Sequence, residues 1–144
     1  MILTSYYQVK LTKNLLEPKH LFLGLALFWT FAVSILCLAS FNNLPSVRVQ
    51  HFDKIVHAAF HFGITALWFL YWKSKKNEQL RKSLLRAFLF SLIYGSLIEI
   101  MQGVFTATRS GDVLDLLGNI TGALIAVLLI LIAASIVRKP GFKK

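Results

Sequence analysis

The chain has 144 residues, of which 56% are hydrophobic, and it carries a formal net charge of +10 at pH 7 with a mean hydropathy of +0.64. The apolar residues are gathered in blocks long enough to cross a bilayer, which takes about 20 residues per helix, so the composition excludes an ordinary soluble domain. A single cysteine, Cys37, excludes a disulfide framework and a cysteine-based metal site.

Four apolar segments predict four transmembrane helices, at residues 21–41, 52–72, 84–105 and 116–137. A cleaved signal peptide is the alternative for the first segment. We expect an uncleaved helix, because the lead before it is long and no small-x-small cleavage site follows a short apolar core. The predicted fold class is all-α: one integral membrane domain of four transmembrane helices over residues 21–137, with a basic lead over 1–20 and a basic tail over 138–144.

The basic residues are distributed unevenly between the two ends of these segments. Thirteen of the sixteen lie in the lead, in the region 73–86 and in the tail, whereas the other two loops hold only Arg48, Lys54 and Arg109. By the positive-inside rule, we expect both termini and the middle loop to be cytoplasmic. The high positive charge is therefore explained by membrane topology, and we expect no nucleic-acid partner.

Polar residues recur at every fourth position in the second segment, as Asp53, His57, His61 and Thr65. This spacing places them on one face of a helix, and two histidines below an aspartate favour a polar cavity. As an acid in the first turn, Asp53 could equally serve the helix dipole. His57 is the better functional candidate because it is shallower, whereas His61 also fits a packing role.

The third segment carries Glu99 on a stripe of small residues, with Gln102 three residues later on nearly the same face. A carboxylate inside a membrane helix costs roughly 2.5–3.5 kcal/mol on insertion scales unless it is paired or hydrated. Glu99 is therefore a candidate functional residue. The alternative is a protonated Glu99 that only hydrogen-bonds a neighbouring helix.

The fourth segment begins with Asp112 and Asp115, and Asn119 follows one turn after Asp115. A role as helix N-cap is sufficient to explain Asp112. Gly118 and Gly122 form a small-residue stripe beside Asn119, which is typical of closely packed membrane helices. We therefore expect the fourth helix to lie close to the helix that its polar side chains contact.

The polar stripes of three helices can be buried only if they face one another. Arg109, in the loop before the fourth segment, could pair with Asp112 or Asp115, or could hold a phosphate or carboxylate group of a ligand. We predict a shallow polar cup within about 10 Å of the extracytoplasmic surface. Its expected members are Asp53, His57, Glu99, Gln102, Arg109, Asp115 and Asn119.

The same residues carry a resemblance to a known family. The chain contains D-K-x-x-H from Asp53 to His57, E-x-x-Q from Glu99, then Arg109, and D-x-x-x-N-x-x-G from Asp115. This order, over about residues 50–135, resembles the VanZ-like family. The resemblance implies a multi-pass protein of the bacterial plasma membrane and cell envelope. It also implies a link to low-level resistance to the glycopeptide teicoplanin, but it supplies no reaction.

Three functional hypotheses remain open. The first is an enzyme that acts on a lipid headgroup or a lipid-linked cell-wall precursor, with Glu99, His57 and Asp115 as acid–base groups. Its substrate-binding residues are Arg109, Gln102, Asn119 and Asp53. The second hypothesis is a lipid- or antibiotic-binding or transport module, and the third is a structural ion-pair network that supports a partner protein.

A divalent metal could instead be bound by Asp53, His57, Glu99 and Asp115, since mixed oxygen and imidazole ligands suit several ions. The sequence has no dense metal-binding motif such as H-E-x-x-H. We therefore predict no metal site. The sequence identifies no cofactor and no oligomeric state.

Overall fold

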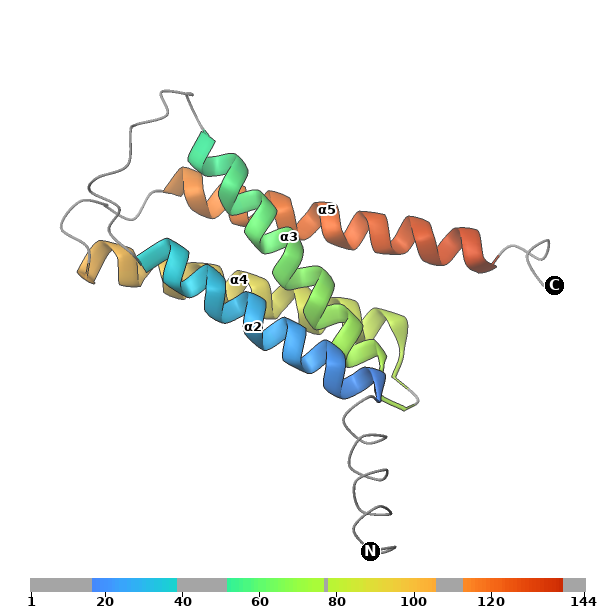
Figure 1. The fold of residues 1–144 in the computed structure, drawn as a ribbon. Coiled ribbons are helices and arrows are strands. Elements are labelled where there is room, and N and C mark those ends of the chain that lie inside the picture. The colour runs from blue at the N-terminus through green and yellow to red at the C-terminus, as the bar shows by residue number, and fades with distance from the viewer. Residues whose placement is uncertain (1–16, 39–51, 77, 106–112, 139–144) are drawn as a thin grey trace, which may run out of the picture.

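The computed structural model describes residues 17–38, 52–76, 78–105 and 113–138. Within these ranges the regular structure is entirely helical: α2 (Pro18–Leu38), α3 (Phe52–Lys73), α4 (Leu80–Phe105) and α5 (Val113–Arg138) (Figure 1). All four helices are long and apolar enough to cross a membrane. The prediction of an all-α protein with four transmembrane helices is confirmed, whereas the cytoplasmic placement of both termini stays a prediction.

Three of the helices begin earlier than their apolar content predicts. α2 begins at Pro18, α4 at Leu80 and α5 at Val113, each about one turn before the predicted start. The added turns of α2 and α4 contain lysine or arginine, whose long aliphatic stems can lie on apolar surface while the charge stays in water. Pro18 itself suits the first position of a helix, where no backbone donor is needed.

α3 is the central helix of the bundle and packs against the other three. It crosses the α2–α4 pair on one side and α5 on the other, and the C-terminal end of α5 extends away from the remaining helices (Figure 1). The start of α3, the end of α4 and the start of α5 lie together at one end of the molecule (Figure 1). The polar residues of α3, α4 and α5 therefore lie near the same end of the bundle.

The apolar core is small, because much of the apolar surface faces outward. Val33, Cys37, Ile64 and Ile98 form one buried cluster. Large side chains such as Phe28 are mostly exposed, as expected of helices that are surrounded by lipid. In such a bundle, hydrogen bonds and close backbone packing contribute to helix association, since the hydrophobic effect does not act between helices in lipid.

The contact between α3 and α5 depends on two glycines. A Cβ atom added to Gly122 would lie 1.9 Å from the carbonyl oxygen of Ala58, and one added to Gly118 would lie 2.8 Å from that of Lys54. Neither separation leaves room for a side chain, so α5 lies directly on the backbone of α3. The close packing expected of this glycine stripe is confirmed.

α2 is joined to the bundle by hydrogen bonds from aromatic side chains. The Trp29 indole donates to the carbonyl oxygen of Phe60 at 3.1 Å. The Trp68 indole donates to the hydroxyl of Thr30 at 3.0 Å, and the Tyr94 hydroxyl donates to the carbonyl oxygen of the same residue at 2.9 Å. These bonds link α2 to both α3 and α4 and fix its position along the bundle.

Candidate functional site

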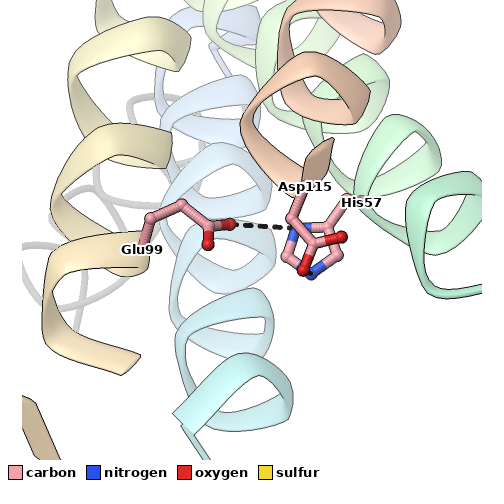
Figure 2. A group of neighbouring side chains, drawn as sticks. All are labelled: His57, Glu99 and Asp115. Atoms are coloured by element: carbon pink, nitrogen blue, oxygen red, sulfur yellow. Dashed lines mark ion pairs between the residues drawn. The ribbon is translucent and has the colours of Figure 1, made fainter. Parts of the chain in front are cut away.

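Polar side chains from three helices meet at the end of the bundle where α3 and α5 begin. His57 lies in the second turn of α3, Asp115 in the first turn of α5, and Glu99 about two turns before the end of α4. Figure 2 shows the Glu99 carboxyl group pointing toward the His57 ring and Asp115 lying beside the same ring. The predicted catalytic residues therefore lie together in space, although 58 positions separate the first from the last.

His57 has a polar partner on each side of its ring. Its Nδ1 atom lies 3.0 Å from Oδ1 of Asn119 and 3.5 Å from Oε1 of Glu99. Its Nε2 atom lies 4.0 Å from Oδ2 of Asp115. Only 5% of the His57 surface is exposed, so these groups, and not solvent, dominate the environment of the ring.

Asn119 determines which ring nitrogen carries the proton. Its amide nitrogen donates toward Oε1 of Glu99 at 3.5 Å, so its oxygen faces His57. An amide oxygen only accepts hydrogen bonds, and Nδ1 of His57 must therefore be the N–H donor. In the neutral ring, the lone pair is then on Nε2, which faces Asp115. Asn119 is almost completely buried, which holds this arrangement in place.

Lys54 is a member of the site that the sequence reasoning did not single out. Its ammonium group lies 2.8 Å from Oδ1 of Asp115 and 2.7 Å from Oδ2 of Asp53. Lys54 and His57 are three residues apart and so share a helix face, which is the signal that could have identified it. The side chain of Asp53 is 53% exposed, and Asp53 contacts Lys54 at the rim of the cluster.

Two other predicted residues face different parts of the bundle. Gln102 is buried and donates from Nε2 to the carbonyl oxygen of Cys37 in α2 at 2.9 Å. His61 lies one turn below His57, with its Nδ1 atom 2.8 Å from the hydroxyl of Ser91 in α4. The contact of His61 is that of a packing residue, one of the two roles considered for it.

Arg109 and Asp112 lie outside the described residues, so the role predicted for each of them stays a prediction. Among the residues that are described, the structure brings together His57, Glu99, Asp115 and Asn119, with Lys54 at the edge of the group. We call these five residues the polar site. It contains groups that can accept a proton and groups that can donate a proton. It also contains two carboxylates that can bind a cation.

The arrangement of the three titratable groups is compact. One nitrogen of His57 and one oxygen each from Glu99 and Asp115 lie within 4.8 Å of one another. Asp53, which the sequence had suggested as a further metal ligand, is not a member of this group. The cluster is therefore tighter than the seven-residue cup predicted from the sequence.

Comparison with known proteins agrees with this architecture. The family model described as VanZ/LLP1 matches residues 3–134, a longer range than the motif resemblance over about residues 50–135. The match also includes α2 and most of the basic lead. No curated protein and no solved structure matches the chain. Because the family model covers nearly all of the sequence, the chain belongs to the VanZ/LLP1 family of membrane proteins.

Proposed function

We propose that the polar site binds the headgroup of a membrane lipid or of a lipid-linked cell-wall precursor. We further propose that the site accepts a proton from this headgroup during a reaction by acid–base catalysis. The observation that carries this proposal is the proximity of His57 to two carboxyl groups, at 3.5 Å from Glu99 and 4.0 Å from Asp115, with Asn119 fixing its tautomer. A histidine oriented in this way is suited to general acid–base catalysis. Its lone pair on Nε2 is the proton acceptor, and Asp115 stabilises the imidazolium that forms.

The remaining groups of the polar site have complementary roles in this proposal. Glu99 lies 3.5 Å from Nδ1 of the ring and accepts from the amide of Asn119, so it orients the amide whose oxygen fixes the tautomer of His57. Lys54 supplies a positive charge beside Asp115, where a phosphate or carboxylate of the headgroup can bind. We assign Arg109, four residues before the start of α5 in the sequence, to the same anion.

The location of the site supports a lipid-borne substrate. It lies at the end of the helices opposite to the basic region 73–86, and the positive-inside rule assigns that basic region to the cytoplasm. We therefore place the polar site at the extracytoplasmic edge of a bacterial plasma membrane. The VanZ-like motif order supports an effect of the protein on susceptibility to teicoplanin.

The test is a comparison of lipid and cell-wall precursor profiles by mass spectrometry in a bacterial host. The host expresses the wild-type chain, or Glu99→Gln, His57→Ala or Asp115→Asn. We expect a species that appears or disappears with the wild-type chain and returns to the level of the empty vector in all three variants. Thr121→Val, a change at an exposed position of α5, is the control and keeps the wild-type profile.

Two other outcomes would contradict the enzymatic proposal. If teicoplanin susceptibility changes while every profile is unaltered, the site is a binding module. If the variants are absent from the membrane, while Thr121→Val is present at wild-type level, the cluster is a structural network. Immunoblots of the membrane fraction distinguish this second outcome from loss of chemistry.

A further inference from the structure

We infer that the polar site is also a binding site for one divalent transition-metal ion, with His57, Asp115 and Glu99 as protein ligands. The inference concerns the same site as the proposed function and adds an ion to it. The sequence contains no metal-binding motif such as H-E-x-x-H, and this absence argued against a metal site. Such motifs have a fixed residue spacing because their ligands lie on one helix. Here the three ligands come from three different helices, so no such spacing is needed.

The first support is the geometry around Nε2 of His57. This nitrogen carries the lone pair, and it faces Oδ2 of Asp115 at 4.0 Å. Two acceptors at this distance cannot hydrogen-bond each other in the neutral ring. Two ligands of one tetrahedral ion are about 3.4 Å apart when each metal–ligand bond is near 2.1 Å. A small rotation of either side chain therefore brings both acceptors within bonding distance of a shared cation.

The second support is the partner of the other ring nitrogen. A histidine that binds a metal commonly donates its second N–H to an oxygen atom, which fixes the ring and its tautomer. Nδ1 of His57 has such a partner in Oδ1 of Asn119, at 3.0 Å. This contact is independent of the ligand cluster, and it is the arrangement that directs the lone pair of Nε2 toward Asp115.

The third support is the charge balance of the cluster. Glu99 and Asp115 bring two negative charges when ionised, and both side chains are largely buried. Asp115 pairs with the ammonium group of Lys54 through Oδ1, at 2.8 Å. The other oxygen of Asp115 faces His57, so an ion can bind there while Lys54 keeps its contact. Two carboxylates this close together attract a divalent ion.

The ion changes the expected chemistry of the site. With Nε2 of His57 bound to the ion, His57, Asp115 and Glu99 would act as ligands, and the proton acceptor would be a water on the ion, whose pKa a divalent metal lowers, in place of Nε2. Mixed imidazole and carboxylate ligands suit Mn²⁺, Fe²⁺ and Zn²⁺ better than Ca²⁺ or Mg²⁺. Mn²⁺ is the most useful probe because its paramagnetism reports the coordinating nitrogen directly.

The experiment measures Mn²⁺ binding to the full chain, purified in detergent with a tag that contains no histidine. Electron paramagnetic resonance counts the bound ions, and its pulsed form detects the coordinating ¹⁴N nucleus. We expect about one ion per chain with a single nitrogen coupling. His57→Gln removes the coupling, whereas His61→Gln, the matched buried histidine one turn away, keeps it.

The carboxylates are tested in the same way. Asp115→Asn and Glu99→Gln weaken Mn²⁺ binding by at least about 10-fold, and Asn119→Leu by about 10–100-fold through loss of the ring orientation. Glu78→Gln, at the opposite end of the bundle, is the carboxylate control and binds as the wild type does. Size-exclusion profiles show which variants are folded, and only those are compared.

Three results would overturn the inference: no stoichiometric Mn²⁺ binding by the wild type, a nitrogen coupling that persists in His57→Gln, or equal weakening by Glu78→Gln. The lipid-profile experiment gives an independent readout. A changed lipid profile without Mn²⁺ binding supports the proposed function and contradicts only the metal-site inference. Conversely, Mn²⁺ binding with an unaltered lipid profile supports the metal site and contradicts the proposed reaction.

Discussion

Replacement of Gly122 by alanine tests whether direct backbone contact between α3 and α5 maintains the polar site. The added Cβ would lie 1.9 Å from the carbonyl oxygen of Ala58, and real Cβ contacts essentially never fall below 3.0 Å. The two helices must therefore separate by at least about 1.1 Å at this point. Ala58 directly follows His57, so the separation is transmitted to the site.

The structural consequence can be converted into an energy. If the helices move apart as rigid bodies, the 3.0 Å contact between His57 and Asn119 lengthens to about 4 Å and no longer counts as a hydrogen bond. Overpacking costs about 1–3 kcal/mol, and a buried polar group without its partner costs a further 1–3 kcal/mol or so. We expect Gly122→Ala to lower the free energy of unfolding by roughly 2–6 kcal/mol.

Cys37 provides the assay, because it is the single cysteine of the chain and is only 3% exposed. A thiol-reactive fluorophore labels it as the purified protein unfolds during a thermal ramp in detergent. The control is Gly24→Ala, since a Cβ at Gly24 meets no atom within 4 Å. We expect a clearly lower midpoint for Gly122→Ala and an unchanged midpoint for Gly24→Ala.

Equal midpoints for these two variants would refute the reasoning. A second-site change sharpens the test. Ala58→Gly removes a side chain but leaves the carbonyl oxygen in place, so it should not rescue Gly122→Ala. Rescue would mean that the helices meet through the methyl group of Ala58, and the proposed transmission through the backbone would be wrong.

Three further substitutions test hydrogen bonds and charge with the same thermal assay. Gln102→Leu removes the donor to the Cys37 carbonyl and should cost about 1 kcal/mol; an unchanged midpoint would show that this bond does not hold α2. Ser91→Ala deprives the buried His61 of its hydroxyl partner and should cost about 1–3 kcal/mol, so a neutral effect would contradict the packing role. Lys54→Met removes a partly buried cation from the polar site and should cost about 1–2 kcal/mol, whereas Lys54→Arg should retain most of the stability; equal losses would exclude a role for the charge.

Much of the fold and of the polar site follows from periodicity in the sequence. Apolar blocks of membrane-spanning length predict the helices, and polar residues at three- and four-residue spacing predict the buried faces. His57 on α3, Glu99 on α4, and Asp115 and Asn119 on α5 converge because they lie at a similar depth in the bundle. The depth of a residue in the membrane follows from its distance along the sequence to the end of its apolar segment. It can therefore be predicted without a structure.

The sequence does not predict which neighbouring helix a side chain contacts within the bundle. Gln102 lies on nearly the same face of α4 as Glu99, yet it reaches the Cys37 carbonyl of α2. This outcome depends on where α2 packs, and interhelical hydrogen bonds that are absent from the sequence pattern fix that position. Lys54 was missed for a related reason, because its contact with Asp115 requires the close approach of α5 to α3.

The two histidines of α3 have an experimental use as a pair. His57 and His61 are separated by one helical turn and are both buried, yet the first faces carboxyl groups and an amide whereas the second faces a serine hydroxyl. In a magnetic resonance or vibrational spectrum, the signal of His61 can serve as an internal reference measured in the same sample. A change confined to His57 then reports events at the polar site, and a change shared by both reports a movement of the helix.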